Sequence, residues 1–154
     1  MKALIQRVSK GTVSIEGKPV SAINHGFVVF VGVGSGDTEE DTRYLADKIA
    51  NLRIISDQEA KFNLSILDTN GEVLVVSQFT LFASTRKGRR PSFTEAASPD
   101  IAEPLIDRFV NSLLEAGIRK VETGHFQKHM LVEILNDGPV TILIDSQDRH
   151  KPRH

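Results

Sequence analysis

The chain has 154 residues, of which 40% are apolar and 25% charged, with a formal net charge of −1. This length fits one domain with a real core, and the near-neutral charge argues against a general nucleic-acid coat. The absence of cysteine excludes disulfides, thiolate nucleophiles and cysteine-bound zinc. No apolar run approaches the ~18 residues of a membrane span, and the alternating N-terminus is unlike a signal peptide, so we expect a cytoplasmic protein without a membrane partner.

Strands dominate the first part of the chain. Apolar and polar residues alternate near the N-terminus, and FVVFVGV is continuously apolar, which is typical of a strand buried on both faces. These patterns predict strands at 2–9, 11–16, 19–23 and 27–33. The glycines of GVGSG lack the spacing and the lysine of a phosphate loop, so we interpret them as a turn into a helix.

Two long helices are expected. Thr38 with Asp41 resembles a capping box and predicts a helix at about 39–52. Apolar pairs recurring every four residues predict a second helix at about 100–116. Pro104 is tolerable only in a first turn, which places the start of this helix near residue 100.

The remaining strands are expected at 53–56, 72–77, 118–123, 129–135 and 140–146. Asn136-Asp137-Gly138 between the last two is typical of a hairpin turn, although Pro139 removes a backbone donor where pairing should resume. The blocks of strands favour an α+β fold: a single compact domain (1–148) with a curved, barrel-like, mixed or mostly antiparallel sheet and two long helices. The basic tail at 149–154 is expected to be flexible.

The familiar catalytic motifs are absent, including the serine-hydrolase elbow, metalloprotease and Walker patterns. We interpret His125 and His129 as surface histidines, and we expect neither a metal nor a cofactor. A polar cluster, Ser77-Gln78-Phe79-Thr80, follows the apolar strand at 72–77, and strand ends are common places for a site. With no base near it in the sequence, a serine or threonine nucleophile is weakly supported, and ordinary turn chemistry remains an alternative.

A local cationic cluster suits an anionic ligand bound at one place on a neutral protein. It packs four cations into five residues: Arg86, Lys87, Arg89 and Arg90. A solvated surface loop is the alternative interpretation.

SQFTL at 77–81 and NDGPVT at 136–141 together strongly resemble the D-aminoacyl-tRNA deacylase family. The similarity extends through MKALIQRVSKGTV at the start, RRPSF at 89–93 and the order of the elements between, and ends near residue 146. The resemblance implies an enzyme that hydrolyses the ester between a D-amino acid and the 3′-terminal ribose of tRNA, and the basic cluster would then contact tRNA.

The resemblance places the catalytic residues at Ser77, Gln78, Phe79 and Thr80. The backbone N–H groups of Phe79 and Thr80 would form an oxyanion hole, with Ser77 and Gln78 orienting the ester and the ribose. Either the Thr80 hydroxyl attacks, or water attacks with help from the vicinal 2′-hydroxyl of the substrate. We favour the second route because no base stands near Thr80 in the sequence.

The resemblance also implies a homodimer in which a cis Gly138–Pro139 peptide enters the active site of the partner. Its carbonyls would accept hydrogen bonds from the substrate ammonium and leave no room for an L side chain. Met130 and Asn136 would complete this chiral selection. Because exclusion acts on the side chain, glycine esters are expected to be substrates as well.

Two other classes of function remain open. One is a non-catalytic RNA-binding module using the basic cluster, which the absence of tryptophan and the single tyrosine disfavour. The other is an amidohydrolase acting on small D-amino acid derivatives, which would leave the basic cluster unexplained.

Overall fold

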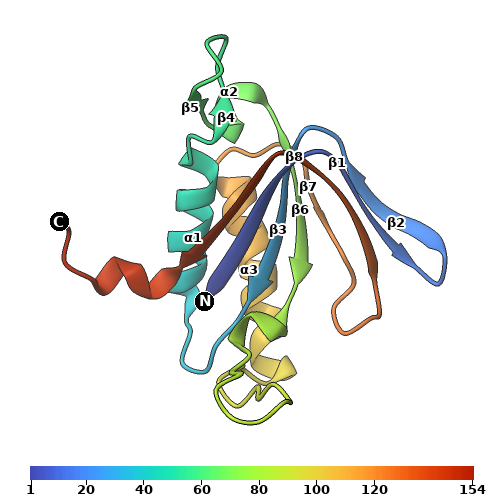
Figure 1. Ribbon diagram of the computed structural model, residues 1–154, viewed down its shortest axis with the longest axis vertical. Coiled ribbons are helices and arrows are strands. Elements are labelled where there is room, and N and C mark those ends of the chain that lie inside the picture. The colour runs from blue at the N-terminus through green and yellow to red at the C-terminus, as the bar shows by residue number, and fades with distance from the viewer.

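Two long strands organise the sheet in the computed structural model, which describes residues 1–154 (Figure 1). They are β1 (Lys2–Ile15) and β8 (Leu131–Asp145), which are antiparallel partners. The other strands of the sheet are β2 (Lys18–Ile23), β3 (Gly26–Gly32), β6 (Glu72–Ser77) and β7 (Val121–Thr123). The strand order is β2-β1-β3-β6-β7, and β8 pairs with β1 alone. The β3–β6 and β6–β7 pairs are parallel and the others antiparallel, which confirms the expected curved, mixed α+β sheet.

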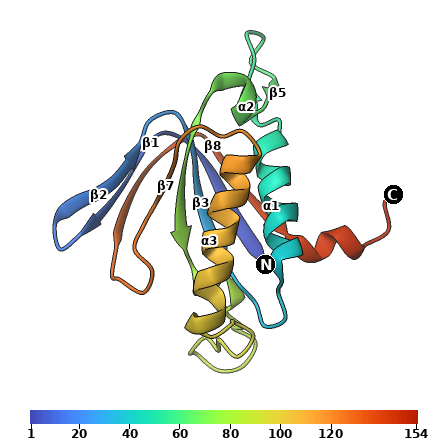
Figure 2. The same cartoon turned by 180° about the vertical axis from the view of Figure 1, so that it is seen from behind.

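The two long helices, α1 (Glu39–Asn51) and α3 (Pro99–Glu115), cover one face of this sheet (Figures 1 and 2). The expected boundaries are confirmed to within one residue. The capping box is also confirmed, because the Thr38 N–H donates to the Asp41 carboxylate over 2.8 Å. Pro104, however, lies in the second turn of α3 and not in the first. Neither helix, nor any shorter one, combines the length and apolarity that crossing a bilayer would require.

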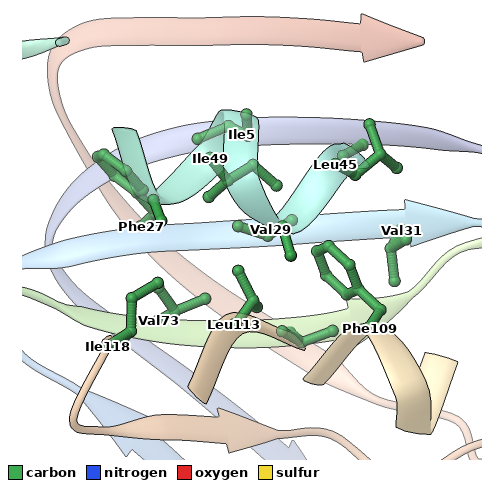
Figure 3. Close-up of a cluster of buried hydrophobic side chains, with 14 of the residues drawn as sticks. Ile5, Phe27, Val29, Val31, Leu45, Ile49, Val73, Phe109, Leu113 and Ile118 are labelled. Carbon is green, nitrogen blue, oxygen red and sulfur yellow. The ribbon is translucent and has the colours of Figure 1, made fainter. Parts of the chain in front are cut away.

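Strand β3 is buried on both faces, as its continuous apolar run predicts. Phe27, Val29 and Val31 face the helices and join the main core with residues such as Leu45, Ile49, Phe109 and Leu113 (Figure 3). Val28 points to the other face, where a smaller buried cluster contains Val8, Val13, Ile23, Leu74 and Val76. The curved sheet therefore has a filled concave side as well as a helix-covered side.

The prediction of a hairpin around residue 138 is wrong. Residues 131–136 and 141–145 do not pair with each other, because both stretches pair with β1 and together form one continuous strand. A hairpin signal describes only the turn residues, whereas β1 is long enough to pair with both halves. Residues 2–9 and 11–16 likewise form one strand and not two.

The other differences are small elements that carry weak sequence signals. Residues 53–56 are strand only at β4 (Ile55–Ser56), which pairs with an unexpected β5 (Phe62–Leu64). The short helix α2 (Ile66–Thr69) follows, and two 3-10 turns, η1 (Phe79–Phe82) and η2 (Ser146–His150), complete the chain. Elements of two to five residues bury too little to leave a periodic pattern.

The start of α1 contacts both termini of the chain. The α-amino group of Met1 lies 2.7 Å from the Asp37 carboxylate and donates to the Ser146 hydroxyl over 2.8 Å. Arg149 donates to the Asp41 carboxylate over 2.8 Å, so the first residue of the basic tail is held against α1. Asp41 thereby links the cap of α1 to the C-terminal turn.

We expect the protein to lose stability as the pH falls below the ordinary pKa of an aspartate, about 3.8. Burial alone raises the pKa of Asp41, but the Ser146 hydroxyl, the Thr38 N–H, the α-amino group and Arg149 together lower it. A lowered folded-state pKa stabilises the fold above the unfolded pKa, and this contribution disappears as the carboxylate is protonated. Thermal unfolding of wild type and Asp41→Asn from about pH 2 to 7 measures this contribution. The difference between the two melting temperatures should be constant above about pH 5 and should shrink below pH 3.8. A difference that stays constant over the whole range would contradict this role of Asp41.

Candidate active site

The polar cluster after β6 forms a tight turn at the end of the sheet. Ser77 is the last residue of β6, and the Gln78 N–H still donates to the Val31 carbonyl over 2.8 Å. Phe79 and Thr80 then open the turn η1, and Gln78 precedes it without capping it through its side chain. The first N–H groups of a helical turn have no acceptor within it, so those of Phe79 and Thr80 are available to a ligand.

The glycines of GVGSG explain why η1 can lie so close to the end of β3. A Cβ at Gly32 would come within 2.8 Å of the Gln78 carbonyl oxygen, and one at Gly34 within 2.6 Å of the Phe82 ring. The two glycines therefore supply space for the turn. The small size of Gly32 and Gly34 agrees with the interpretation of GVGSG as a structural turn. The two glycines also help to position the polar cluster, because the turn η1 packs against them.

A cavity of about 690 Å³ opens beside this turn. Its walls come from the ends of β3 and β6, the start of α3, and the segment that leads into β8. Most of the lining is apolar, and four phenylalanines contribute to it: Phe30, Phe79, Phe93 and Phe126. Phe79 and Phe93 meet edge to face with their ring centroids 4.9 Å apart. A largely apolar cavity with a few polar groups in its lining is a typical small-ligand site.

The structure brings only some of the expected residues to this cavity. Ser77, Gln78, Phe79 and Met130 line it, whereas Thr80 does not. The Thr80 hydroxyl instead accepts a hydrogen bond from the Gln78 side-chain amide. No histidine, carboxylate or lysine forms a hydrogen bond with Thr80.

A second cavity of about 190 Å³ shares Ser77 with the first and contains Glu103, Asp107 and Thr123. No group of three or more histidine, aspartate or glutamate side chains is arranged as a metal site.

The residues expected for chiral selection lie elsewhere, in a bulge of β8. The register passes from Gln6 opposite Thr141 to Val8 opposite Asn136, so residues 137–140 all face Arg7. The Gly138–Pro139 peptide within this bulge is cis, as the resemblance implies. None of the bulge residues lines the cavity of the same chain.

The side chain of Asn136 closes the bulge. Its carbonyl accepts from the Val140 N–H over 3.1 Å, and its amide donates to the Thr141 hydroxyl over 3.0 Å. The first bond satisfies the Val140 N–H at a point where the ladder with β1 is interrupted. Gly138 and Pro139 are thereby held on the exposed surface.

Arg7 contacts this bulge and was not among the residues predicted from the sequence. It is buried beneath the bulge and donates to the Asp137 carbonyl over 3.0 Å and to the Ile54 carbonyl over 2.8 Å. The ring of Phe62 lies against its guanidinium. The sequence does contain an indication of this role, because Arg7 follows Ala3 and Ile5 on the inward face of an alternating strand. A charged residue at such a position calls for an explanation.

The basic cluster lies in the loop between η1 and α3, at the end of the sheet opposite the bend of β8 (Figure 1). The loop is pinched by mutual backbone hydrogen bonds of 2.8 Å between Ser84 and Ser92. Its cations are exposed, and none forms a salt bridge. The loop is close to the cavity, because Phe79 and Phe93 at its base line the cavity wall.

Comparison with known proteins assigns this architecture. The family model described as D-Tyr-tRNA(Tyr) deacylase matches residues 4–145. A D-aminoacyl-tRNA deacylase of Thermotoga petrophila is 60% identical over 146 residues, covering 95% of this chain and 97% of that protein. One of Dehalococcoides mccartyi is 57% identical over 153 residues, covering 99% of each.

Solved structures agree with this fold. A c-Myc DNA unwinding element binding protein superposes with a TM-score of 0.89 at 37% identity, covering 94% of this chain and 98% of the other. A probable eukaryotic D-amino acid tRNA deacylase superposes with a TM-score of 0.80 at 19% identity, covering 93% and 97%, a likeness of fold alone. Because the family model spans nearly the whole chain and its relatives exceed half identity, the chain belongs to the D-Tyr-tRNA(Tyr) deacylase family.

Proposed function

We propose that the protein hydrolyses the ester bond between a D-amino acid and the 3′-terminal ribose of tRNA. The observation that carries this proposal is the cavity at the end of β6, bounded by the SQFT turn, in a chain that matches a deacylase family over residues 4–145. The cavity is large enough for a nucleoside carrying an amino acid. The exposed basic loop beside it suits the polyanionic remainder of a tRNA.

In the proposed reaction, the turn stabilises negative charge that develops on the ester carbonyl oxygen. The N–H groups of Phe79 and Thr80 have no acceptor within η1 and would donate to this oxygen. Each such donor is worth about 2.7–4 kcal/mol in the transition state. Ser77 and Gln78 lie at the same end of the cavity and would orient the ester and the ribose.

We infer that water attacks with the help of the substrate 2′-hydroxyl, and that Thr80 is not the nucleophile. A threonine nucleophile needs a partner that removes its proton. The side-chain hydrogen-bond partner of the Thr80 hydroxyl is the amide of Gln78, which donates and cannot serve as a base. The 2′-hydroxyl is held next to the reacting ester by the substrate itself, so its assistance needs no additional protein group.

The bulge of β8 is proposed to act in the site of a second copy. In its own chain it does not contribute to the cavity, and β8 bends at the end of the sheet remote from the loop that borders the cavity (Figure 1). The outer edge of β8 has no partner strand, and Leu131, Leu135 and Leu143 are more than half exposed along it. An unpaired, apolar edge strand is a surface that proteins normally cover, and a homodimer covers it while bringing each bulge to the other chain.

Within such a dimer, Gly138 and Pro139 would reject L-amino acids by occupying the space of their side chain. Their carbonyls would accept hydrogen bonds from the substrate ammonium, while Asn136 keeps the bulge in shape and Met130 forms part of the receiving cavity. Glycine has no side chain to collide, so glycyl-tRNA would be accepted.

The test is parallel deacylation of D-alanyl-, glycyl- and L-alanyl-tRNA, with release of the amino acid as the readout. The proposal expects the first two to be hydrolysed and the third to be spared. Binding of tRNA without release of the amino acid would favour a non-catalytic nucleic-acid-binding protein. The structurally similar c-Myc DNA unwinding element binding protein is named for nucleic-acid binding. D-alanyl release with glycyl-tRNA untouched would contradict exclusion as the basis of selection.

Neutralising the basic loop is expected to weaken tRNA binding without changing chirality. Replacing Arg86, Lys87, Arg89 and Arg90 by glutamine removes four exposed cations that form no ion pairs within the chain. Each lost phosphate contact lowers the slope of log K against log salt by about 0.7–0.9. A salt series of tRNA binding measures this slope, and the D-to-L preference should stay unchanged. Wild-type affinity at every salt concentration would show that the loop does not contact tRNA.

A further inference from the structure

The lining of the cavity beside η1 includes one formally charged side chain. It belongs neither to the basic loop nor to the polar cluster. This side chain is Lys128, with His129 next to it on the same wall. Both are exposed, and Lys128 forms no salt bridge with a carboxylate. No aspartate or glutamate lines this cavity, and the nearby carboxylates of Glu103 and Asp107 belong to the smaller cavity that shares Ser77 and Phe126 with it.

A well-anchored turn presents Lys128 to the cavity. The Lys128 N–H donates to the His125 carbonyl over 3.2 Å, and Gln127 between them has a φ of 60°. Phe126 packs against the main core on one side of the turn. On the other side Met130 packs so closely on Gly124 that a Cβ there would lie 2.5 Å from its sulfur. The backbone that carries Lys128 is thus fixed at both ends.

The charge of Lys128 limits which part of the substrate it faces. The α-ammonium of an aminoacyl ester is cationic and would be repelled by a lysine at close range. The reacting carbonyl is proposed to lie against the N–H groups of the turn η1, a different element from the turn that carries Lys128. The remaining anionic group of the substrate is the phosphodiester that joins the terminal nucleoside to the rest of the tRNA.

We propose that Lys128, with the ring N–H of His129 as a second donor, binds the phosphodiester immediately 5′ of the terminal nucleoside. This inference rests on the proposed function and names a contact within that site. The basic loop also borders this cavity, because Phe93 of that loop packs against Phe79 in the cavity lining. Lys128 would fix how deeply the terminal nucleoside enters, and the basic loop would attract the body of the tRNA.

The experiment compares two substrates that differ in this phosphate. D-alanyl-tRNA contains the phosphodiester, whereas 3′-O-D-alanyl-adenosine contains none. The variants are Lys128→Met, which keeps the apolar stem, Lys128→Arg, which keeps the charge, and Lys48→Met as a control on the exposed face of α1.

Lys128→Met is expected to lower kcat/KM for D-alanyl-tRNA about ten-fold, mainly through KM, because a charge-assisted hydrogen bond is lost. The salt slope should fall by about 0.7, the value for one contact on a single strand. Turnover of the adenosine ester should be unchanged, Lys128→Arg should restore most of the tRNA activity, and Lys48→Met should resemble wild type.

An equal loss with both substrates would overturn the proposal, since Lys128 would then act on the shape or chemistry of the site. Unchanged tRNA turnover would overturn it as well. A wild-type protein that cleaves neither ester would refute the proposed function alone, and equilibrium binding would still test the contact. Lys128→Met should then bind cytidylyl-(3′,5′)-adenosine more weakly than wild type does, and both proteins should bind adenosine equally well. If both proteins bind the dinucleotide with the same affinity, Lys128 does not contact the phosphodiester.

Discussion

Gly138→Ala is expected to lower turnover of D-alanyl-tRNA about 100-fold while the chain still folds. A Cβ at this position would lie 2.8 Å from Cγ2 of Val140 and 3.0 Å from Nη2 of Arg7, and the φ of Gly138 is 133°. The guanidinium of Arg7 is hydrogen-bonded in place beneath the bulge, so the bulge must move. A displacement of about 1 Å at a substrate-positioning group is enough for a loss of this size.

Gly17→Ala is the matched control. Gly17 also has a positive φ, 77°, in the turn between β1 and β2, but a Cβ there would meet no atom within 4 Å. Both variants place an L side chain at a positive φ, at a cost on the order of 1–3 kcal/mol that is larger for Gly138→Ala, and thermal unfolding measures the cost in each. Only Gly138→Ala should lose turnover. Wild-type turnover in Gly138→Ala would mean that the shape of the bulge is irrelevant to the reaction.

Removing the 2′-hydroxyl of the substrate is expected to cost more than removing the hydroxyl of Thr80. A tRNA ending in 2′-deoxyadenosine should be deacylated about 100-fold more slowly or worse, the lower range of general acid–base assistance. Thr80→Ala should retain activity within about ten-fold, because the Thr80 hydroxyl contacts Gln78 and no base. Both are measured as single-turnover rates with D-alanyl esters.

Each rate must be divided by the spontaneous hydrolysis rate of the same ester, since the deoxy ester is intrinsically less reactive. A dead Thr80→Ala, together with normal acceleration of the deoxy ester, would make Thr80 the nucleophile and reverse the mechanism.

The parts of the fold that could be predicted from the sequence are those that local patterns encode. The capping box at Thr38 and Asp41 marks the start of α1, and the apolar run of β3 marks a strand enclosed on both faces. The bounds of β6 (Glu72–Ser77) are as predicted, and the polar cluster that follows it does lie at a cavity.

The parts that could not be predicted depend on long-range pairing. Asn136-Asp137-Gly138 has the composition of a hairpin turn, and only the length of β1 makes this segment a bulge within one strand. The role of Arg7 follows from the same pairing, because it is the one β1 residue that faces residues 137–140. Lys128 belongs to the cavity only because the turn into β8 folds back toward η1, which no local pattern specifies.

A composite site makes a prediction about mixed dimers. One variant, Phe79→Pro, removes a proposed oxyanion donor at the start of η1, where a proline fits the helical turn. The other, Gly138→Ala, damages the bulge and leaves the cavity intact. Each homodimer should be nearly inactive. In the heterodimer, one site combines the intact cavity of the Gly138→Ala chain with the intact bulge of the Phe79→Pro chain.

The most direct measurement is therefore D-alanyl-tRNA turnover by heterodimers of these two variants, co-expressed with different affinity tags and purified over both. If the bulge of one chain completes the cavity of the other, the heterodimer should recover about half of the wild-type turnover, since one of its two sites is intact. Failure to obtain a dimer, or a heterodimer as inactive as both parents, would contradict a site shared between two chains.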